Sequence, residues 1–495
     1  MCGWRKTGRP TDSRKYEDML FFKKKGPLVR ERKDHCISRS NIDPDALKVL
    51  YRLSGAGYTA YLVGGSVRDL LLGRHPKDFD VGTDARPNEI RRIFRNCFLI
   101  GRRFRLAHVI FGKKVIETST FRAQPRDVGT ENGLYQTEDN TFGTPEEDAK
   151  RRDFTVNGLF YDIKTFSVID YVDGLRDLEK KVLRCIGDPN VRFREDPVRM
   201  MRAVKFAARL SFEIDRTSRK AIQKHHADIK NASIPRVCEE VYRLFTYRSS
   251  AVAFRLLWQF ELLSDLLPEL AAHIDGNGGE KARIWRYLAA FDADADSEQA
   301  TNGFRTAVLC YDLYCTRLAE CQAREREHAH GHSSSVQHLS HTVVGYFSEH
   351  LKIPKVAFFK ACSILDMQRR FAEMPKRGRS NRVVSHPDFL EALAVRRIVL
   401  LVEGGDHAVL EAWKALYDEV RHERRPARSA STDFVVEVVH EGEEAAAFAE
   451  DEALAQNNAR RRRPRRHNRS RTADRPFTAP QTEGVSADPQ PTASK

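Results

Sequence analysis

The spacing of apolar residues changes repeatedly over residues 43–121, and each change predicts a short element. Helical spacing follows Asp43, and Pro44 stands where a first helical turn accepts proline. Short apolar runs interrupted by glycine and polar turns are typical of strands. The predicted strands are residues 58–63, 78–82, 109–111 and 115–121, and the predicted helices are residues 44–55, 67–72 and 87–94. This mixture predicts an α+β head, in which helices cover one face of an antiparallel or mixed sheet.

From residue 148 to about residue 419 the pattern becomes mainly helical. Residues 199–210, 217–229 and 236–245 are predicted to form a compact helical neck, and a polar break near residues 292–301 divides the helices that follow. Residues 124–146 are rich in Gly, Asp, Glu, Asn and Thr, which predicts a mobile loop, and loops of this length are often functional.

The two ends of the chain differ in composition from the rest. Residues 1–42 are polar and basic, which predicts a disordered extension. Past residue 420 a basic stretch is followed by an acidic, alanine-rich one, and residues 460–475 then hold nine arginines. This composition predicts a disordered tail whose basic arm binds a polyanion by releasing counterions.

Charge narrows the choice of partner. The 495 residues carry a formal net charge of +15, which suits RNA, DNA or a membrane surface, although a solvated basic surface is the alternative. Nine cysteines without a CxxC pair argue against zinc ribbons and a disulfide framework, and favour a reducing cytosol. No stretch approaches the roughly 20 apolar residues of a membrane span, so we expect a cytoplasmic protein without stable membrane insertion.

A glycine turn followed by two acids is the most informative local motif. Gly64, Gly65 and Ser66 follow a predicted strand, and backbone amides at such a turn can approach phosphate. Asp78 and Asp80 occupy alternate positions of the next strand, where two carboxylates facing the same way can hold a divalent metal. Two solvated acids on a surface strand are the alternative, but phosphate and metal at one place predict phosphoryl or nucleotidyl transfer with two Mg²⁺ ions.

Further polar residues near this motif each allow two interpretations. Glu117, in an alternating strand, is either a third carboxylate of the site or an exposed sheet residue. Arg68 and Asp69 either pair with each other or position phosphate, and we favour a structural role for Asp69. The histidine-rich stretch of residues 328–341 matches no metal-ligand spacing and is interpreted as a solvated loop.

Four ordered blocks over about 140 residues resemble class II nucleotidyltransferases, the bacterial poly(A) polymerases and the CCA-adding tRNA nucleotidyltransferases. The first is the glycine turn with Asp78-Phe-Asp80. Arg151-Arg152-Asp153-Phe-Thr-Val-Asn157 resembles the ribose-recognition motif, and Ile186-Gly-Asp-Pro leading into Glu195-Asp196-Pro-Val-Arg199 resembles the base-recognition motif. Gly158 stands where the family usually has alanine, and residues 118–120 vary its apolar-threonine pattern.

The chemistry of these residues agrees with such roles. Asp196 can accept from an exocyclic amine while Arg199 donates to a ring nitrogen, a combination that favours adenine and cytosine over guanine and uracil. By spacing alone, Asp196-Pro197 is also an ordinary helix start. Asp153 and Asn157, four apart on an expected helical face, suit ribose hydroxyls, and Arg152 suits the triphosphate; a charged helix start is the alternative.

One block resembles the signature that separates poly(A) polymerases from CCA enzymes. It runs from Ile100 to Val109, and its cationic and stacking groups suit an RNA end or the triphosphate. A basic hairpin edge is the alternative. The residues that we expect to make these contacts are Arg102, Arg103, Arg105 and His108.

The resemblance implies a template-independent polynucleotide adenylyltransferase that adds AMP from ATP to RNA 3′ ends. A CCA-adding or A-adding tRNA nucleotidyltransferase and a silent RNA-binding scaffold remain as alternatives. We expect a monomer that acts on RNA, with RNA-decay proteins as candidate partners. The expected parts are a basic extension (1–42), a catalytic head (43–185), a helical neck (186–245), a helical RNA-binding body (246–428) and a disordered basic tail (429–495).

Overall fold

The computed structural model describes residues 26–101, 105–123, 126–128, 136–138, 141–295, 297–327 and 338–423. Contacts divide the chain into two units, Met1–Arg425 and Pro426–Lys495, and the described residues belong to the first. Several predictions lie outside the described residues: the arginine-rich tail, Arg102 and Arg103, about half of the loop at 124–146, and most of the histidine-rich stretch.

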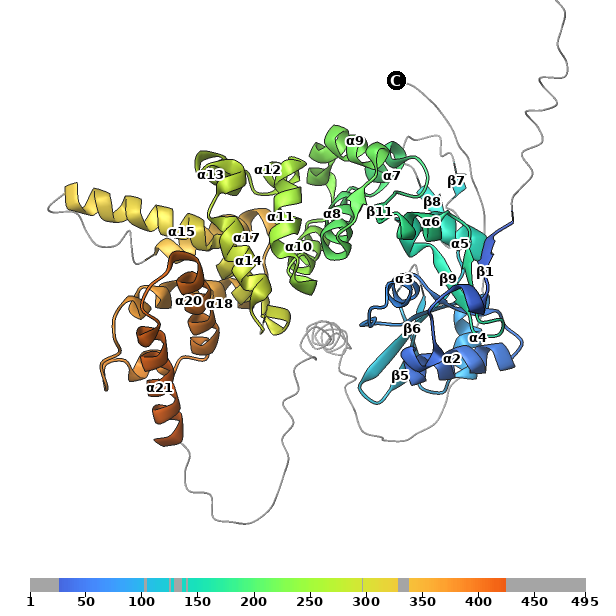
Figure 1. The fold of residues 1–495 in the computed structure, drawn as a ribbon, viewed down its shortest axis with the longest axis horizontal. Helices are drawn as coiled ribbons and strands as arrows, with labels where there is room; N and C mark the ends of the chain where they lie inside the picture. The colour runs from blue at the N-terminus through green and yellow to red at the C-terminus, as the bar shows by residue number, and fades with distance from the viewer. Residues whose placement is uncertain are drawn as a thin grey trace, which may run out of the picture. The chain divides into compact units, whose positions relative to one another are not determined.

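An eight-stranded mixed sheet forms the head (Figure 1). Its strand order is β1-β10-β9-β2-β3-β6-β5-β4, in which only β3 and β6 pair in parallel. The strands are β1 (Leu28–Arg30), β2 (Ala60–Val63), β3 (Asp80–Thr83), β4 (Cys97–Ile100), β5 (Leu106–Phe111), β6 (Lys114–Thr120), β9 (Leu159–Asp162) and β10 (Ser167–Asp170). The predicted mixed sheet is therefore confirmed, with strand ends that shift by up to three residues.

Helices complete the head. Those of the head are α2 (Pro44–Gly55), α3 (Gly65–Leu71), α4 (Pro87–Ile93), α5 (Pro145–Arg151) and α6 (Gly174–Glu179). Helix α2 begins where predicted because the Asp43 carboxylate accepts from the backbone N–H groups of Asp45 and Ala46.

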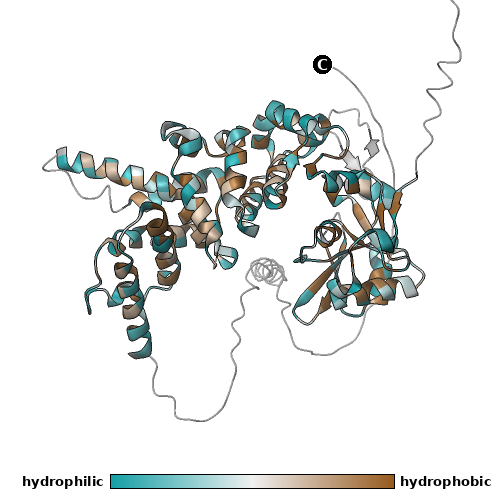
Figure 2. Cartoon of the chain, in the orientation of Figure 1, coloured by the Kyte–Doolittle hydropathy of each residue, from teal (hydrophilic) through white to brown (hydrophobic). Residues whose placement is uncertain are grey.

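The two faces of the sheet are covered unequally. Helices α2 and α4 pack on one face, over the main core. A smaller cluster, which includes Val63, Phe121, Ala149 of α5 and Phe160, covers part of the other face. Figure 2 shows the brown, hydrophobic residues concentrated in these strands, whereas the helices carry both brown and teal residues. Among the described residues, none of the helices covers the part of the second face on β4, β5 and β6, where Phe98 and Ile100 are exposed.

Two predictions about the head were wrong. The helical region does not begin at residue 148, because β9 and β10 form a hairpin that lies in the sheet between β1 and β2. At its turn the Asp162 carboxylate accepts from the Lys164 N–H and the Thr165 hydroxyl. Part of the N-terminal extension is also ordered: β1 pairs with β10, and Ile37 and Ile42 are buried in the core. Burial of single isoleucines among many charges stabilises this segment without producing a periodic pattern.

Beyond the head the described chain is almost entirely helical, as predicted. The neck consists of α7 (Pro189–Glu195), α8 (Val198–Leu210), α9 (Arg216–His225) and α10 (Ile234–Arg243), with a small parallel pair of β11 (Val182–Leu183) and β12 (Glu213–Ile214). The later helices are α11 (Ser250–Gln259), α12 (Leu262–Leu266), α13 (Pro268–Gly276), α14 (Ile284–Ala293), α15 (Asn302–Glu327), α17 (Leu339–Leu351), α18 (Lys355–Gln368), α19 (Asn381–Val384), α20 (Phe389–Glu403) and α21 (His407–Glu423).

Two further predictions can be compared with these helices. The polar break at residues 292–301 separates α14 from α15, as expected. The loop at 124–146 contains a short antiparallel pair, β7 (Arg126–Val128) and β8 (Gln136–Glu138). None of the described helices combines the length and the apolar composition that a bilayer crossing requires.

Candidate active site

One pocket of about 790 Å³ brings together most of the residues that the motifs single out. It is lined by the glycine turn, by the segment that leads into β3, by the residues after α5 and by one side of the neck helices. The predicted site residues in its lining are Gly64, Gly65, Ser66, Arg68, Asp78, Asp80, Arg152, Asp153, Asn157, Asp196 and Arg199. Residues separated by up to 135 positions in the chain thus share one cavity.

The glycine turn is held tightly between β2 and α3. Gly64 has φ +73° and ψ −130°, a conformation that L-residues with a Cβ avoid, and its N–H donates to the Leu159 carbonyl at 3.0 Å. A Cβ on Gly64 would lie 2.7 Å from Nη1 of Arg152. The Ser66 hydroxyl donates to the Val63 carbonyl at 3.0 Å, so this side chain closes the turn. The backbone conformation therefore favours glycine at position 64, and a Cβ there would require the end of the Arg152 side chain to shift.

The two aspartates lie together but not on one strand. Asp80 is the first residue of β3 and is half-buried, whereas Asp78 is exposed and precedes the strand. The prediction of alternate strand positions was therefore wrong for Asp78, because the chain becomes a strand only where Asp80 pairs with Val63. Burial raises the pKa of Asp80 to about 6, the charges of Glu117 and Asp78 add to the rise, and Arg152 opposes it. A cation at this place would relieve the crowding of negative charge.

Glu117 lies on β6 beside this pair. Burial and the charge of Asp78 raise the pKa of Glu117, and His108 Nε2 on β5 lies 3.8 Å from Glu117 Oε1. Burial lowers the pKa of His108. Within the described part of the chain, no three Asp, Glu, His or Cys side chains are arranged to hold a metal ion by themselves. Asp78 and Asp80 nevertheless fit Mg²⁺, which commonly takes one or two carboxylates and completes its shell with water and substrate phosphate oxygens.

Arg68 and Asp69 form a buried support under the turn. The side chains are 2% and 4% exposed, and Arg68 donates to Asp69 at 2.8 Å. Arg209 of α8 pairs with the other carboxylate oxygen of Asp69 at 2.7 Å, and Arg68 also donates to the amide oxygen of Asn157. Asp69 therefore has the structural role we favoured, and Arg68 connects the turn to the ribose-recognition block.

Asp153 and Asn157 are brought together, although not by a helix. Helix α5 ends at Arg151, and only a 3₁₀ turn, η3 (Thr155–Asn157), follows, so the predicted helical face was wrong. One oxygen of Asp153 accepts from the Phe154 N–H at 2.8 Å and from Asn157 Nδ2 at 3.0 Å. The other accepts from Nε and Nη2 of Arg202 at 2.9 and 2.6 Å. These bonds fill the acceptor capacity of the carboxylate and leave Asn157 with one free N–H.

Arg152 extends beside the turn. Asp148 holds it through a 2.9 Å ion pair, and its Nη1 also donates to the Asn157 carbonyl at 3.4 Å. The guanidinium stacks on the Phe160 ring at 5.5 Å from its centroid. A cation fixed in this way beside Gly64 suits the triphosphate role that the motif predicts.

Asp196 lies at the junction of α7 and α8. Its carboxylate accepts from Arg236 at 2.8 Å and caps no helix, because Pro197 occupies the N-cap of α8. The Arg199 guanidinium donates to the Arg192 carbonyl at 2.8 Å and to Glu195 at 3.2 Å, and the Arg199 backbone N–H donates to the Asp196 carbonyl at 3.0 Å. Helix α8 does start directly after Asp196-Pro197, as the helix-start alternative expects, but the Asp196 side chain makes no capping hydrogen bond and is left to face the pocket. Both side chains line the pocket with hydrogen-bonding capacity left for a base.

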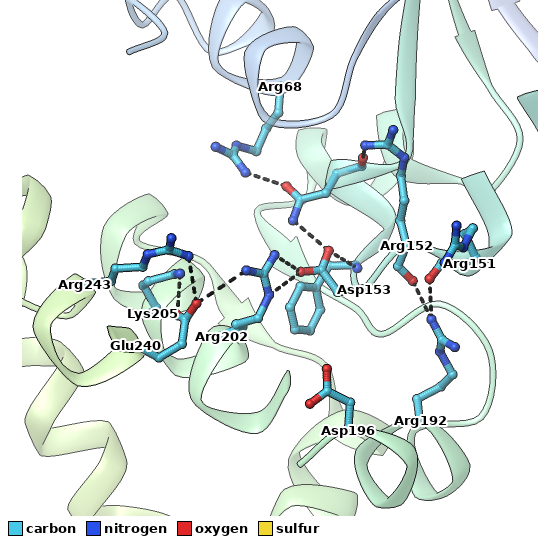
Figure 3. A network of polar contacts seen from close by, with 12 residues as sticks. Arg68, Arg151, Arg152, Asp153, Arg192, Asp196, Arg202, Lys205, Glu240 and Arg243 are labelled. Carbon is cyan, nitrogen blue, oxygen red and sulfur yellow. Dashed lines mark hydrogen bonds and ion pairs between the residues drawn. The ribbon is translucent and has the colours of Figure 1, made fainter. Parts of the chain in front are cut away.

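A network of charges from the neck was not predicted from the motifs. Arg202 lies between the carboxylates of Asp153 and Glu240, and Glu240 also pairs with Lys205 at 2.5 Å and Arg243 at 3.1 Å (Figure 3). A signal existed in the sequence: the cationic residues of α8 recur every three or four positions, the spacing of one helical face. These residues are Arg199, Arg202, Lys205 and Arg209.

The signature block is described only in part. Arg105 is exposed just before β5, and His108 lies within β5, next to Glu117. Neither lines the pocket. Their predicted contacts with RNA or triphosphate remain predictions, and those of Arg102 and Arg103 fall outside the described residues.

We expect Gly64→Ala to lower kcat/KM for the nucleotide about 10- to 100-fold, because the new methyl group would displace the Arg152 guanidinium. Gly73→Ala is the matched control, since Gly73 also has a positive φ, of +68°, but nothing lies within 4 Å of the place that its new methyl group would take. Both variants should lose about 1–2 kcal/mol of stability from the backbone conformation. Equal kcat/KM values for the two variants would show that the close approach between Gly64 and Arg152 does not affect the reaction.

A mixed sheet with a glycine turn, the Asp78–Asp80 carboxylates and the Asp196–Arg199 pair beside one pocket is typical of class II nucleotidyltransferases. The "Poly A polymerase head domain" model matches residues 60–184, and the "Probable RNA and SrmB- binding site of polymerase A" model matches residues 211–274. Poly(A) polymerase I of Salmonella typhi is 38% identical over 383 residues, which cover 75% of this chain and 81% of the relative. That of Haemophilus influenzae is 34% identical over 403 residues, covering 79% and 87%.

CCA-adding enzymes are similar as well. That of Lactobacillus helveticus is 39% identical over 230 residues, 46% of this chain. The structure of the Bacillus stearothermophilus CCA-adding enzyme in complex with CTP has a TM-score of 0.55 and 26% identity, covering 77% of this chain and 82% of that one. The similarity to the poly(A) polymerases extends over more of both chains. The chain therefore belongs to the poly(A) polymerase I family of polynucleotide adenylyltransferases.

Proposed function

We propose that this protein adds AMP from ATP to the 3′ ends of RNA without a template and releases pyrophosphate. The observation that carries the proposal is the shared pocket, in which the Asp78–Asp80 pair and the Asp196–Arg199 pair face one cavity. A nucleotide whose base reaches the second pair can present its phosphates to the first. Mg²⁺, ATP as the substrate and a cytoplasmic location are parts of the same proposal.

The base would be selected by the neck. The Asp196 oxygen that does not bond Arg236 accepts from the exocyclic amine of adenine, and Arg199 donates to the neighbouring ring nitrogen. Guanine and uracil present a carbonyl oxygen where Asp196 needs a donor, so these bases leave buried polar groups unpaired. Arg192 supports this arrangement by donating to the carbonyls of Arg151 and Arg152, at 2.5 and 3.0 Å.

The sugar and phosphates would be held by the head. Asn157 offers its free N–H to a ribose hydroxyl while Asp153 and Arg68 fix its amide. Arg152 and the Gly64–Ser66 turn face the triphosphate. Asp78 and Asp80 would hold the two Mg²⁺ ions, with Glu117 close by, and bound ions would lower the pKa of the attacking 3′-hydroxyl and neutralise charge on the leaving pyrophosphate. The protein groups align the RNA hydroxyl and the α-phosphate.

The test is to supply Mg²⁺ and each labelled nucleotide singly with one of two acceptors. A generic single-stranded RNA and a tRNA that lacks its CCA end serve as the acceptors. We expect long A-tails on the generic RNA, and incorporation of G or U reduced by at least about 100-fold. Addition limited to C, C and A on the tRNA would instead establish CCA synthesis. Incorporation of no nucleotide would favour a silent RNA-binding scaffold.

A further inference from the structure

The uncovered face of the sheet leads directly to the catalytic carboxylates. Antiparallel pairing sets Phe98 of β4 opposite His108 of β5, and His108 opposite Glu117 of β6. Strands β6 and β3 pair in parallel with Val81 beside Thr118, so the preceding residue on each strand places Asp80 beside Glu117. Residues directly opposite each other point to the same face of a sheet. The row from Phe98 to Asp80 crosses three strand spacings, roughly 14 Å.

The far end of this row is unusually apolar for a surface. Phe98 is 61% exposed, Ile100 50% and Val115 42%, and all three belong to the same face. On the opposite face of β4, Cys97 is buried and Leu99 packs against the core, so the sheet has a filled side and an open one. A group of exposed aromatic and aliphatic side chains of this kind indicates a binding surface for a ligand or partner.

The charges around the row favour a nucleic acid as the occupant. Glu117 is the sole acidic residue of β4, β5 and β6, and it lies at the catalytic end of the row. The exposed Arg105 lies just before β5, next to the end of this face at which Leu106 pairs with Ile100. An aromatic surface whose described strands carry no acidic residue before the catalytic end, with a cation near by, matches the stacking platforms that bind single strands without reading sequence.

We propose that the ring of Phe98 stacks on a base near the 3′ end of the RNA, with Ile100 and Val115 beside it, and directs the strand along the His108 row to Asp80. This inference rests on the proposed function and adds to it the binding place of the acceptor. The face is continuous with the site at which the RNA hydroxyl must arrive, and the occupant is therefore the acceptor strand rather than the nucleotide. Phe98 is a positioning residue for RNA and does not contact ATP.

The test compares Phe98→Ala with the full-length wild-type chain, using an oligoadenylate acceptor and labelled ATP. Stacking contributes about 1–3 kcal/mol per base, so KM for RNA should rise about 5- to 100-fold while KM for ATP changes less than about twofold. Phe359→Ala is the matched control, since Phe359 is 59% exposed on α18, outside the sheet. Phe98→Trp should retain RNA binding, and Phe98→Leu, which keeps apolar area without a ring, should lose most of it.

Binding without turnover separates this inference from the proposed function. Anisotropy of a labelled RNA with a 3′-deoxy end needs no catalysis, and oligonucleotides abasic at the last positions should bind wild type and Phe98→Ala equally. Equal affinity of wild type, Phe98→Ala and Phe98→Leu for intact RNA would overturn the proposal that the Phe98 ring stacks on a base. A Phe98→Ala protein that changes oligomeric state, with unaltered RNA affinity, would assign the face to a second copy and also overturn it. Failure of the wild-type protein to incorporate AMP would contradict the proposed function. The binding measurements would still decide whether Phe98 stacks on RNA, because they need no catalysis.

Discussion

We expect Asp80→Asn to lose at least about a thousandfold in AMP incorporation while remaining folded and becoming more stable in metal-free buffer. Asparagine has the shape of aspartate but is a poor ligand for Mg²⁺ and carries no charge. Burial, Glu117 and Asp78 all disfavour the charged form of Asp80, whose pKa rises to about 6. Each unit of pKa is worth about 1.4 kcal/mol, so removal of the charge should raise the unfolding free energy at pH 7 by about 1–3 kcal/mol.

The direction of the Asp80 pKa shift determines whether the stability of the folded protein rises or falls with pH. A carboxyl whose folded pKa is raised binds more protons in the folded than in the unfolded state between about pH 4 and pH 6. The stability of the wild-type protein should therefore fall as pH rises through that window, and the advantage of Asp80→Asn should grow over it. Urea unfolding at pH 4 and pH 7, with a chelator present, measures the difference.

Asp78→Asn is the matched comparison because Asp78 is exposed just before the strand that begins with Asp80. It should be equally inactive but should gain little stability, since a solvated charge costs little. Added Mg²⁺ should raise the melting temperature of the wild-type protein and leave that of Asp80→Asn unchanged. Activity in Asp80→Asn, or a loss of its stability, would contradict the assignment of this carboxylate as a metal ligand.

Local motifs predicted the parts of the site that depend on short stretches of chain. The Gly64–Ser66 turn, the Asp78–Asp80 pair and the Asp196–Arg199 pair could all be found because their chemistry needs particular residues close in sequence. The secondary structure under them was harder to predict. Asp153 and Asn157 have helical spacing, but they meet through a hydrogen bond across a 3₁₀ turn, which satisfies the same spacing.

What the sequence does not reveal depends on tertiary pairing. Strands β9 and β10 were interpreted as helical because short apolar runs fit either structure, and only pairing with β2 and β1 decides between them. The contact of Arg202 with Asp153 joins residues 49 positions apart, so no local sequence pattern predicts it. Likewise, all four residues of β4 are apolar, so their sequence does not indicate an open face, and only the register shows that Phe98 shares a row with Glu117.

The second large effect is expected at Asp153, whose replacement by asparagine should cost about 2–3 kcal/mol of unfolding free energy at pH 7. Burial alone would raise the pKa of this carboxyl, but the charge of Arg202 and the hydrogen bonds from Asn157, Arg202 and the Phe154 N–H lower it to about 2. The side chain is 11% exposed, so solvent screens the Arg202 pair weakly. Asp153→Asn keeps the shape but leaves the Arg202 guanidinium without its closest anion.

The pH dependence provides a control within the same experiment. Because the folded pKa is depressed, the stabilisation is present above the unfolded value of about 4 and is lost as pH falls towards about 2. The difference between wild type and Asp153→Asn should therefore shrink over that window. A double-mutant cycle with Arg202→Gln should give a coupling of about 1–3 kcal/mol, and additive effects would show that the two side chains do not cooperate.

The same variants distinguish two ways in which Asp153 would act on the ribose of a bound nucleotide. If the Asp153 carboxylate bonds the ribose directly, Asp153→Asn should weaken the preference for ATP over dATP. Arg202→Gln should then keep that preference. The acceptors of Asp153 are already filled by Arg202, Asn157 and the Phe154 N–H, which leaves Asn157 to reach the hydroxyl. Arg202→Gln should then lose the ATP preference together with Asp153→Asn, although Arg202 belongs to the neck. Retention of full selectivity in Arg202→Gln would show that Asp153 contacts the ribose without this support.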